Sequence, residues 1–262
     1  HVVTRRQRQM CIRDSRIITA ASLFDGHDAA INVMRRLIQS AGAEVIHLGH
    51  DQSAKAVVDC AIQEDAHGVA LTSYQGGHVE YFTYIRQLLD EAGCEHIRIF
   101  GGGGGTITPP EIKTLHESGI SKIYSPDDGR TMGLMGMIHH LMGIASEVDL
   151  IHPDRVSSLN GPVTPEDTAK VGLLLTMSES ADDATFKATL DKCRSSENDV
   201  PVIGFTGTGG AGKSSLLDEL MLRILRDNPG KKVCLLCVDP TRKRTGGALL
   251  LSLIHISEPT RP

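Results

Sequence analysis

The feature that most constrains the fold is a fivefold alternation between short apolar runs and longer segments of helical periodicity, which begins at Arg16. Runs of this length favour buried strands, and strands that alternate with helices are typical of a parallel sheet covered on both faces. We therefore predict an α/β fold with a doubly wound, five-stranded parallel sheet. The predicted strands are 16–22, 44–49, 68–73, 96–100 and 122–125, and the predicted helices are 29–41, 53–65, 79–92, 110–118 and 131–144.

Beyond this pattern the chain changes character. Three prolines and no sustained periodicity over 146–167 indicate a linker, placed at 148–163, so the first domain is predicted to span 16–147. A helix is predicted next, with Thr164 as its N-cap, Pro165 in its first turn and Asp167 in the capping-box position. A second helix over 182–193 and a strand over 200–207 complete the lead-in to a second α/β domain, which we place at 164–250.

The two ends of the chain read differently from the rest. Residues 1–15 and 251–262 resemble translated sequencing adapters, so we expect the native segment, 16–250, to be a fragment of a longer protein. Without these ends, which carry net charges of +3 and 0, the formal charge of −5 becomes −8. An acidic chain offers no general nucleic-acid surface, and no apolar run approaches the roughly 18 residues of a membrane span. We expect neither nucleic acid nor membrane as a partner.

The cysteines indicate a reducing compartment. After the end segment that contains Cys11 is set aside, five remain, without the spacing of a disulfide framework, which favours free thiols and a cytoplasmic protein. Cys234 and Cys237 lie in an apolar run that reads as a strand. Residues three apart on a strand point to opposite faces, so we interpret this pair as core packing rather than a metal site.

Three unusual segments follow three of the predicted strands. They are 23–28, which contains Asp25 and His27, 73–78, and the glycine run 101–105. Because parallel strands end at one edge of the sheet, we expect these segments to meet there. A loop histidine can offer one ring nitrogen to a metal while a carboxylate holds the other, and a glycine loop lets backbone approach a bulky ligand. The helix start after the glycines also offers free amides to an anion.

These segments together resemble the D-x-H-x-x-G … S-x-L … G-G signature of cobalamin-binding domains, a flavodoxin-like family, and in particular the branch of fused isobutyryl-CoA mutases. The resemblance covers residues 16 to about 145. It implies that His27 is the lower axial ligand of cobalt, and that the displaced nucleotide tail lies beside the serine and glycine segments. The residues implied in cofactor binding are Asp25, Gly26, His27, Asp28, Ser73, Gln75, Gly76, Gly101, Gly102, Gly103, Gly104 and Thr106. Two departures are Ala30 in place of glycine and Tyr74-Gln75 after the serine.

A second motif lies in the second domain. Residues Gly207–Ser214 satisfy G-x-x-x-x-G-K-[ST] between a predicted strand and a helix, the context of a phosphate-binding loop. In this reading Lys213 contacts the outer phosphates and Ser214 binds Mg²⁺. The predicted nucleotide-binding residues are Gly207, Gly209, Gly210, Ala211, Gly212, Lys213, Ser214 and Ser215. The following segment resembles the metallochaperone GTPases of B12-dependent mutases, which implies GTP as the nucleotide and Asp239 as a further Mg²⁺ contact.

The order of these parts resembles that of the fused isobutyryl-CoA mutases. The resemblance implies adenosylcobalamin and GTP with Mg²⁺ as cofactors, an acyl-CoA substrate, a downstream acyl-CoA barrel in the same parent chain, and a homodimer. It implies a carbon-skeleton isomerase with a GTP hydrolase module; we assign no catalytic residue here and expect the fragment alone to be inactive. Two alternatives are a corrinoid carrier for methyl transfer, and a B12-sensing P-loop chaperone without mutase activity.

Overall fold

The computed structural model describes residues 15–164, 166–194, 201–208, 210–230, 233 and 235. The two predicted adapter segments, apart from Ser15, lie outside the described residues, as do Pro165, Gly209 and Asp239 and the cysteine pair. The backbone of Asp28 is described but its side chain is not. Two compact units divide at residues 197 and 198, and each is described by itself.

The first unit contains five strands that alternate with helices, as the apolar pattern predicts. The elements of both units are β1 Arg16–Ser22, α2 Asp28–Ser40, β2 Glu44–Gln52, α3 Ala54–Gln63, β3 Gly68–Thr72, α4 His78–Glu91, β4 Arg98–Gly102, α5 Pro109–Glu117, β5 Lys122–Tyr124, α6 Pro126–Ala145, α7 Pro153–Ser157, α8 Thr168–Ser180, α9 Asp183–Cys193 and α10 Lys213–Asp227.

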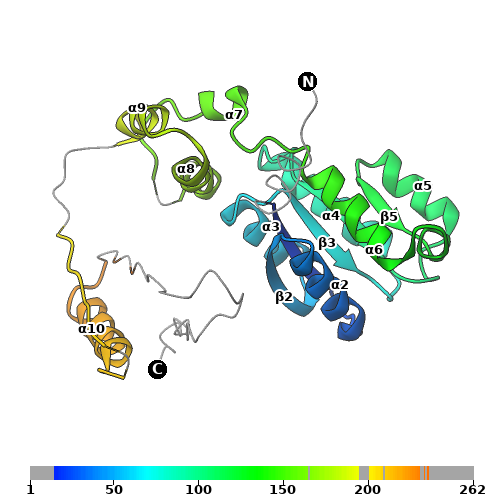
Figure 1. Ribbon diagram of the computed structural model, residues 1–262, viewed down its shortest axis with the longest axis horizontal. Coiled ribbons are helices and arrows are strands. Elements are labelled where there is room, and N and C mark those ends of the chain that lie inside the picture. Colours follow the sequence, from blue (N-terminus) through cyan, green and yellow to red (C-terminus); the bar gives the residue numbers. More distant parts are fainter. Residues whose placement is uncertain are drawn as a thin grey trace. The chain divides into compact units, whose positions relative to one another are not determined.

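All described strand pairs are parallel, and the sheet order is β2-β1-β3-β4-β5. This is the flavodoxin-like order, with the change of direction between β1 and β3. Helices α3, α4 and α5 pack on one face of the sheet around Phe82 and Leu115, while α2 and α6 pack on the other around Phe100 (Figure 1). The predicted doubly wound sheet is therefore confirmed.

The start of helix α6 differs from its prediction. Helix α6 begins at Pro126, five residues before its predicted start, because Ser125 and Asp128 form a capping box around Pro126 at the first turn. Gly133, with φ of 66°, then interrupts the helix. The segment between Ser125 and Gly133 is therefore a capped helical turn that lines the end of the sheet rather than a loop.

The expected linker is partly helical, because it contains α7. The prediction of Thr164 as the N-cap of the next helix is wrong: α8 begins at Thr168, and Asp167 is its N-cap residue. The reason is that the Asp167 carboxylate accepts hydrogen bonds from the Thr164 amide and hydroxyl, at 3.0 and 3.1 Å, and closes a separate turn before the helix. Helix α9 follows with Asp182 as its N-cap, in agreement with the predicted second helix.

The second unit contains helix α10, which follows the phosphate-loop motif as predicted. The strand predicted over 200–207 is absent from residues 201–208, where Val202 and Ile203 are 94% and 71% exposed. A strand is stabilised by pairing with a neighbour, and the part of this unit that the structure describes contains no strand to pair with. The domain boundaries given above stay predictions, although α8 and α9 lie in the first compact unit.

Two further observations concern the described residues only. Cys60, Cys94 and Cys193 are free thiols. None of the described helices is long and apolar enough to cross a bilayer.

Candidate functional site

The three segments singled out in the sequence meet at the carboxyl edge of the sheet, as predicted. The Ser22 hydroxyl at the end of β1 donates to the Ser73 hydroxyl at 2.9 Å. The Ser73 amide in turn donates to the carbonyl of Gly102, the last residue of β4, at 2.9 Å. The next amide, that of Tyr74, donates to Asp25 Oδ2 at 2.6 Å. These bonds join the loops after β1, β3 and β4 into one surface.

Asp25 and His27 form a fixed pair on this surface. Asp25 is fully buried, and its Oδ1 accepts the His27 amide at 2.9 Å and lies 2.7 Å from His27 Nδ1. An ionised carboxylate can only accept, so Nδ1 carries a hydrogen, and the neutral tautomer that this selects has its lone pair on Nε2. Because the His27 side chain is 65% exposed, this arrangement leaves Nε2 as the nitrogen able to bind a metal.

The Asp25 carboxylate stays ionised despite its burial. Burial by itself raises the pKa of Asp25, but the hydrogen bonds from the Tyr74 and His27 amides and from the His27 ring outweigh this effect and hold the pKa below its ordinary value. The Tyr74 ring also lies beside the His27 ring, with centroids 5.4 Å apart and planes inclined by 47°. Carboxylate and tyrosine together restrict the orientation of the imidazole.

A cavity of about 460 Å³ opens between the sheet and helices α2 and α6. This volume lies within the range of small-molecule sites, roughly 300–1,000 Å³. Its lining is mostly apolar and includes Ala30, Met34, Leu71, Thr72, Tyr74, Phe100, Gly101, Gly102, Gly103, Gly104, Tyr124, Pro126, Leu134, Met137 and Leu141. Four of the five glycines in the predicted run therefore border the cavity.

Thr72 is among the residues that line the cavity, and its hydroxyl is buried without a hydrogen-bond partner. Ser73, the predicted contact, is not among the lining residues; it is buried, and its hydroxyl is bonded to Ser22. Sequence reasoning missed Thr72, although its position as the last residue of β3 was a usable signal. It also missed Tyr124, whose hydroxyl lies 3.0 Å from His140 Nδ1 at the cavity wall.

The glycine run is required by packing as well as by access. A Cβ on Gly103 would lie 1.9 Å from the Ser73 carbonyl oxygen, and one on Gly101 would lie 2.4 Å from the Phe82 ring. Gly104 adopts a positive φ of 58°, which glycine tolerates at little cost. The close approach of this loop to the loop after β3 therefore depends on the missing side chains.

Other predicted residues lie near the edge but outside the cavity lining. Gly26 and Gly76 are exposed, and no atom lies within 4 Å of the position a Cβ would take. The Gln75 carbonyl lies 3.1 Å from Nδ1 of the buried His78, and Thr106 is exposed in the turn that follows the glycines. Their predicted role in cofactor binding stays a prediction.

The expectation of an anion site at the start of α5 is wrong. The first two residues of the helix are Pro109 and Pro110, which have no backbone N–H. At the third position the Glu111 carboxylate accepts the Thr108 amide at 2.8 Å and the Thr108 hydroxyl at 2.6 Å. A carboxylate therefore already lies where an anion was predicted to bind.

The described part of the phosphate-loop motif has the backbone expected of such a loop. Gly210 and Gly212 adopt positive φ values of 77° and 75°, and Gly212 caps α10 in the left-handed conformation. Lys213 Nζ donates to the Thr208 carbonyl at 2.7 Å, so the lysine closes the loop on itself. Ser214 is exposed at the first turn of α10, as are Ala211 and Ser215. The turn, the lysine and the helix start are therefore together, as the motif requires.

Two protein-family models match the chain. Residues 15–123 match the B12 binding domain, and residues 171–260 match the methylmalonyl-CoA mutase-associated GTPase MeaB. The first match covers the sheet except for the last residue of β5, and the second includes the phosphate loop and α10.

Curated relatives match across both regions. The fused isobutyryl-CoA mutase of Geobacillus kaustophilus is 48% identical over 94% of this chain and 23% of its own length. That of Nocardia farcinica is 50% identical over 92% of this chain and 22% of its own length. The 2-hydroxyisobutanoyl-CoA mutase small subunit of Aquincola tertiaricarbonis is 34% identical over 43% of this chain and 81% of its own length. The chain thus spans less than a quarter of the two fused relatives and most of the small subunit.

Proposed function

The chain belongs to the family of the fused isobutyryl-CoA mutases, and on this premise we propose that its first domain binds cobalamin with His27 Nε2 as the lower axial ligand of cobalt. The observation that carries the proposal is the pair of His27 and buried Asp25. A carboxylate 2.7 Å from Nδ1 fixes the tautomer and the ring orientation and makes Nε2 a better ligand. The exposure of the imidazole, 65%, leaves room for a corrin above it.

The cavity beside this pair fits the nucleotide tail that leaves cobalt when the histidine binds. Its apolar walls suit an aromatic base, and we propose that the buried, unpaired Thr72 hydroxyl donates to a ring nitrogen of that base. The Gly102–Gly104 backbone borders the cavity beside Thr72, since Gly102 pairs with Thr72 in the sheet. We propose Thr72 as the tail contact alongside the glycine loop; the predicted contributions of Gly26, Asp28, Ser73, Gln75, Gly76, Gly101 and Thr106 stay part of the proposal.

The second unit is proposed to bind GTP with Mg²⁺. Its phosphate loop would contact the phosphates through backbone amides and Lys213, and Ser214 would bind the metal ion. Asp239, outside the described residues, is the proposed further Mg²⁺ contact. The GTPase family match over 171–260 supports guanine as the base.

For the parent protein we propose isomerisation of a branched acyl-CoA by a 1,2 shift of the carbon skeleton, with isobutyryl-CoA as the substrate. Adenosylcobalamin supplies the radical that starts such a rearrangement, and the acyl-CoA barrel is proposed to lie downstream in the same parent chain. A homodimer in the cytoplasm is the proposed setting, and the free thiols of the described residues fit a reducing compartment. In this chain His27 and Asp25 bind and orient the cofactor and take no proton from the substrate.

Titration with hydroxocobalamin and adenosylcobalamin tests the proposal. Absorbance changes are expected when the imidazole replaces the cofactor's own base, and His27→Ala should abolish them. His139→Ala, which removes an exposed histidine on α6, is the matched control and should bind like the parent chain. No spectral change, or the same change in His27→Ala, would reject the assignment.

A second measurement identifies the ligand directly. Paramagnetic resonance of bound cob(II)alamin shows a nitrogen splitting from the axial ligand, which changes from a triplet to a doublet when the ligand nitrogen is ¹⁵N. Protein labelled with ¹⁵N-histidine should therefore give doublets with unlabelled cofactor. Triplets would show that the benzimidazole of the cofactor remains bound to cobalt.

A further inference from the structure

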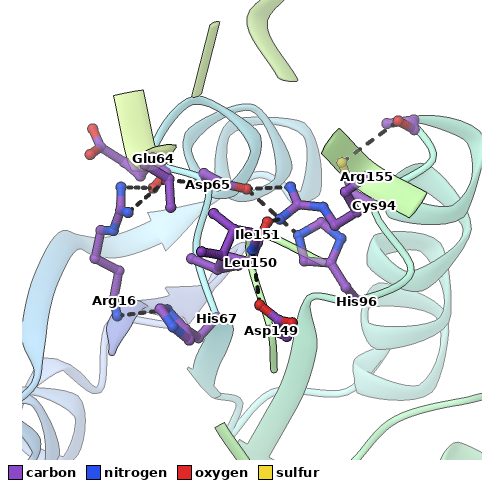
Figure 2. A network of polar contacts seen from close by, with 12 residues as sticks. Arg16, Glu64, Asp65, His67, Cys94, His96, Asp149, Leu150, Ile151 and Arg155 are labelled. Atoms are coloured by element: carbon purple, nitrogen blue, oxygen red, sulfur yellow. Dashed lines mark hydrogen bonds and ion pairs between the residues drawn. The ribbon is translucent and has the colours of Figure 1, made fainter. Parts of the chain in front are cut away.

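A buried carboxylate lies at the edge of the sheet opposite the cofactor edge. Asp65, between α3 and β3, is 3% exposed and is surrounded by partners from distant parts of the chain. Arg155 of α7 donates to its Oδ1 at 2.6 Å, and His96 Nε2 lies 3.7 Å from the same oxygen (Figure 2). Arg155 also donates to the Leu150 carbonyl. A buried charge of this kind is stable only with such partners.

The second oxygen of Asp65 is bound by helix α8. Thr176 Oγ1 donates to Asp65 Oδ2 at 2.7 Å and accepts from Arg16 Nη2 at 2.8 Å, so one hydroxyl joins an anion to a cation. Arg16 also donates to the Glu64 carbonyl at 2.7 Å (Figure 2). Thr176 is 2% exposed, and replacing it with an isosteric valine would leave both charged groups without this partner.

The backbone at Asp65 indicates that the carboxylate itself is needed. Asp65 follows the C-cap residue of α3 and adopts a positive φ of 46°, a position that favours glycine. An aspartate there is strained relative to glycine, and it makes contacts that glycine could not make. The strain is compatible with a stable fold because Arg155 and Thr176 bind the side chain.

Helix α8 also approaches this site more closely than side chains would allow. A Cβ on Gly172 would lie 3.0 Å from the Ile62 carbonyl oxygen and 3.4 Å from Asp65 Cβ. The glycine therefore lets the backbone of α8 pack directly on the end of α3. The match to the GTPase family begins at residue 171, inside this helix.

We propose that Asp65, Arg155 and Thr176 form a clasp that anchors residues 150–194 to the cobalamin-binding domain, so that the GTPase module starts from a fixed point on that domain. The clasp contacts α7, which precedes the predicted start of the second domain at residue 164, and α8, which follows it. Strand β3 begins at Gly68, just after the clasp, and ends at Thr72 in the cofactor cavity. The anchor and the cofactor edge therefore lie at the two ends of one buried strand.

Hydrogen exchange of the full chain, followed by mass spectrometry, tests the clasp. In the parent chain, local opening of α8 must break the two hydrogen bonds of the Thr176 hydroxyl. Thr176→Val removes this cost, so the α8 amides should exchange at least tenfold faster. Thr176→Ser keeps the hydroxyl and should stay within about threefold of the parent chain. Amides of β1 and β3 should exchange at the parent rate in both variants, and hydroxocobalamin titration should be unchanged, which separates this result from a failure of the cofactor assignment.

Two further variants make the test decisive if Thr176→Val does not fold. Arg155→Gln removes the guanidinium that binds Asp65, from a side chain that is itself 19% exposed. This variant should accelerate exchange in α7 and α8. Lys55→Gln, which removes the same positive charge from an exposed side chain of α3, is the matched control and should have no effect. The proposal is overturned if α8 exchange is unaltered in Thr176→Val and Arg155→Gln, or if the strands accelerate as much as α8.

Discussion

Replacing Asp25 with asparagine should weaken cobalamin binding, because the carboxylate accepts three hydrogen bonds and a side-chain amide cannot accept all three at once. Oδ2 accepts from the Tyr74 amide at 2.6 Å, while Oδ1 faces both the His27 amide and the His27 ring. Asparagine has one oxygen, so in either orientation its NH₂ group faces an N–H donor. The variant must lose the Tyr74 bond or release the His27 ring.

The expected magnitude follows from the partners. Loss of a residue that orients a metal-bound histidine typically costs about 10–100-fold in metal affinity. This corresponds to about 1.4–2.7 kcal/mol, comparable with one hydrogen bond to a charged group, roughly 1.5–3 kcal/mol. We therefore expect Asp25→Asn to raise the Kd for hydroxocobalamin by one to two orders of magnitude, with less effect than His27→Ala.

The assay is an absorbance titration of the parent chain, Asp25→Asn and Asp59→Asn, with circular dichroism to confirm that each variant is folded. Asp59 lies on the exposed face of α3 and controls for the lost charge. Binding of Asp25→Asn within twofold of the parent chain, with an unaltered spectrum, would refute the reasoning that the buried carboxylate orients the imidazole.

Three other predictions concern the cavity, the glycine run and the sheet edge. Gly103→Ala should destabilise the domain by about 1–3 kcal/mol in urea unfolding, because its Cβ would lie 1.9 Å from the Ser73 carbonyl oxygen. Gly105→Ala, with no atom within 4 Å, is the control, and equal effects would contradict the packing argument. Thr72→Val should leave the stability of the domain unchanged or higher, since the hydroxyl is buried and unpaired. It should weaken binding of cobalamin but not of cobinamide, which lacks the tail. Equal affinities of the variant and the parent chain for cobalamin would exclude the tail contact. Burial lowers the pKa of His67 from 6.5 to about 4, so between these pH values the unfolded state binds a proton that the folded state does not. The free energy of unfolding should therefore fall as the pH decreases from 6.5 to 4. The decrease should be at most about 3 kcal/mol, at about 1.36 kcal/mol for each pKa unit. Urea unfolding across this range should show a shallower decrease in His67→Gln.

The order of helices and strands could be read from the sequence because it depends on local periodicity. The run 16–22 became β1 without a shift, and the loops after β1, β3 and β4 were expected at one edge from the rule for parallel sheets. The Asp25 and His27 pair was also readable, since its two members are only two residues apart. The phosphate-loop motif belongs to the same class, because its turn and helix are contiguous in the chain.

Tertiary structure alone decided which side chain of a neighbouring pair reaches the cavity. Thr72 and Ser73 are both small hydroxyl residues, and only the pleat of β3 and the bond from Ser22 show that Thr72 faces the cavity. The capping of α5 by Glu111 likewise depended on where the helix begins. The bond between Asp65 and Thr176 joins residues 111 positions apart, and no local pattern encodes such a contact. Periodicity reflects which face of an element is buried, whereas the partner across that face is determined only when the elements pack.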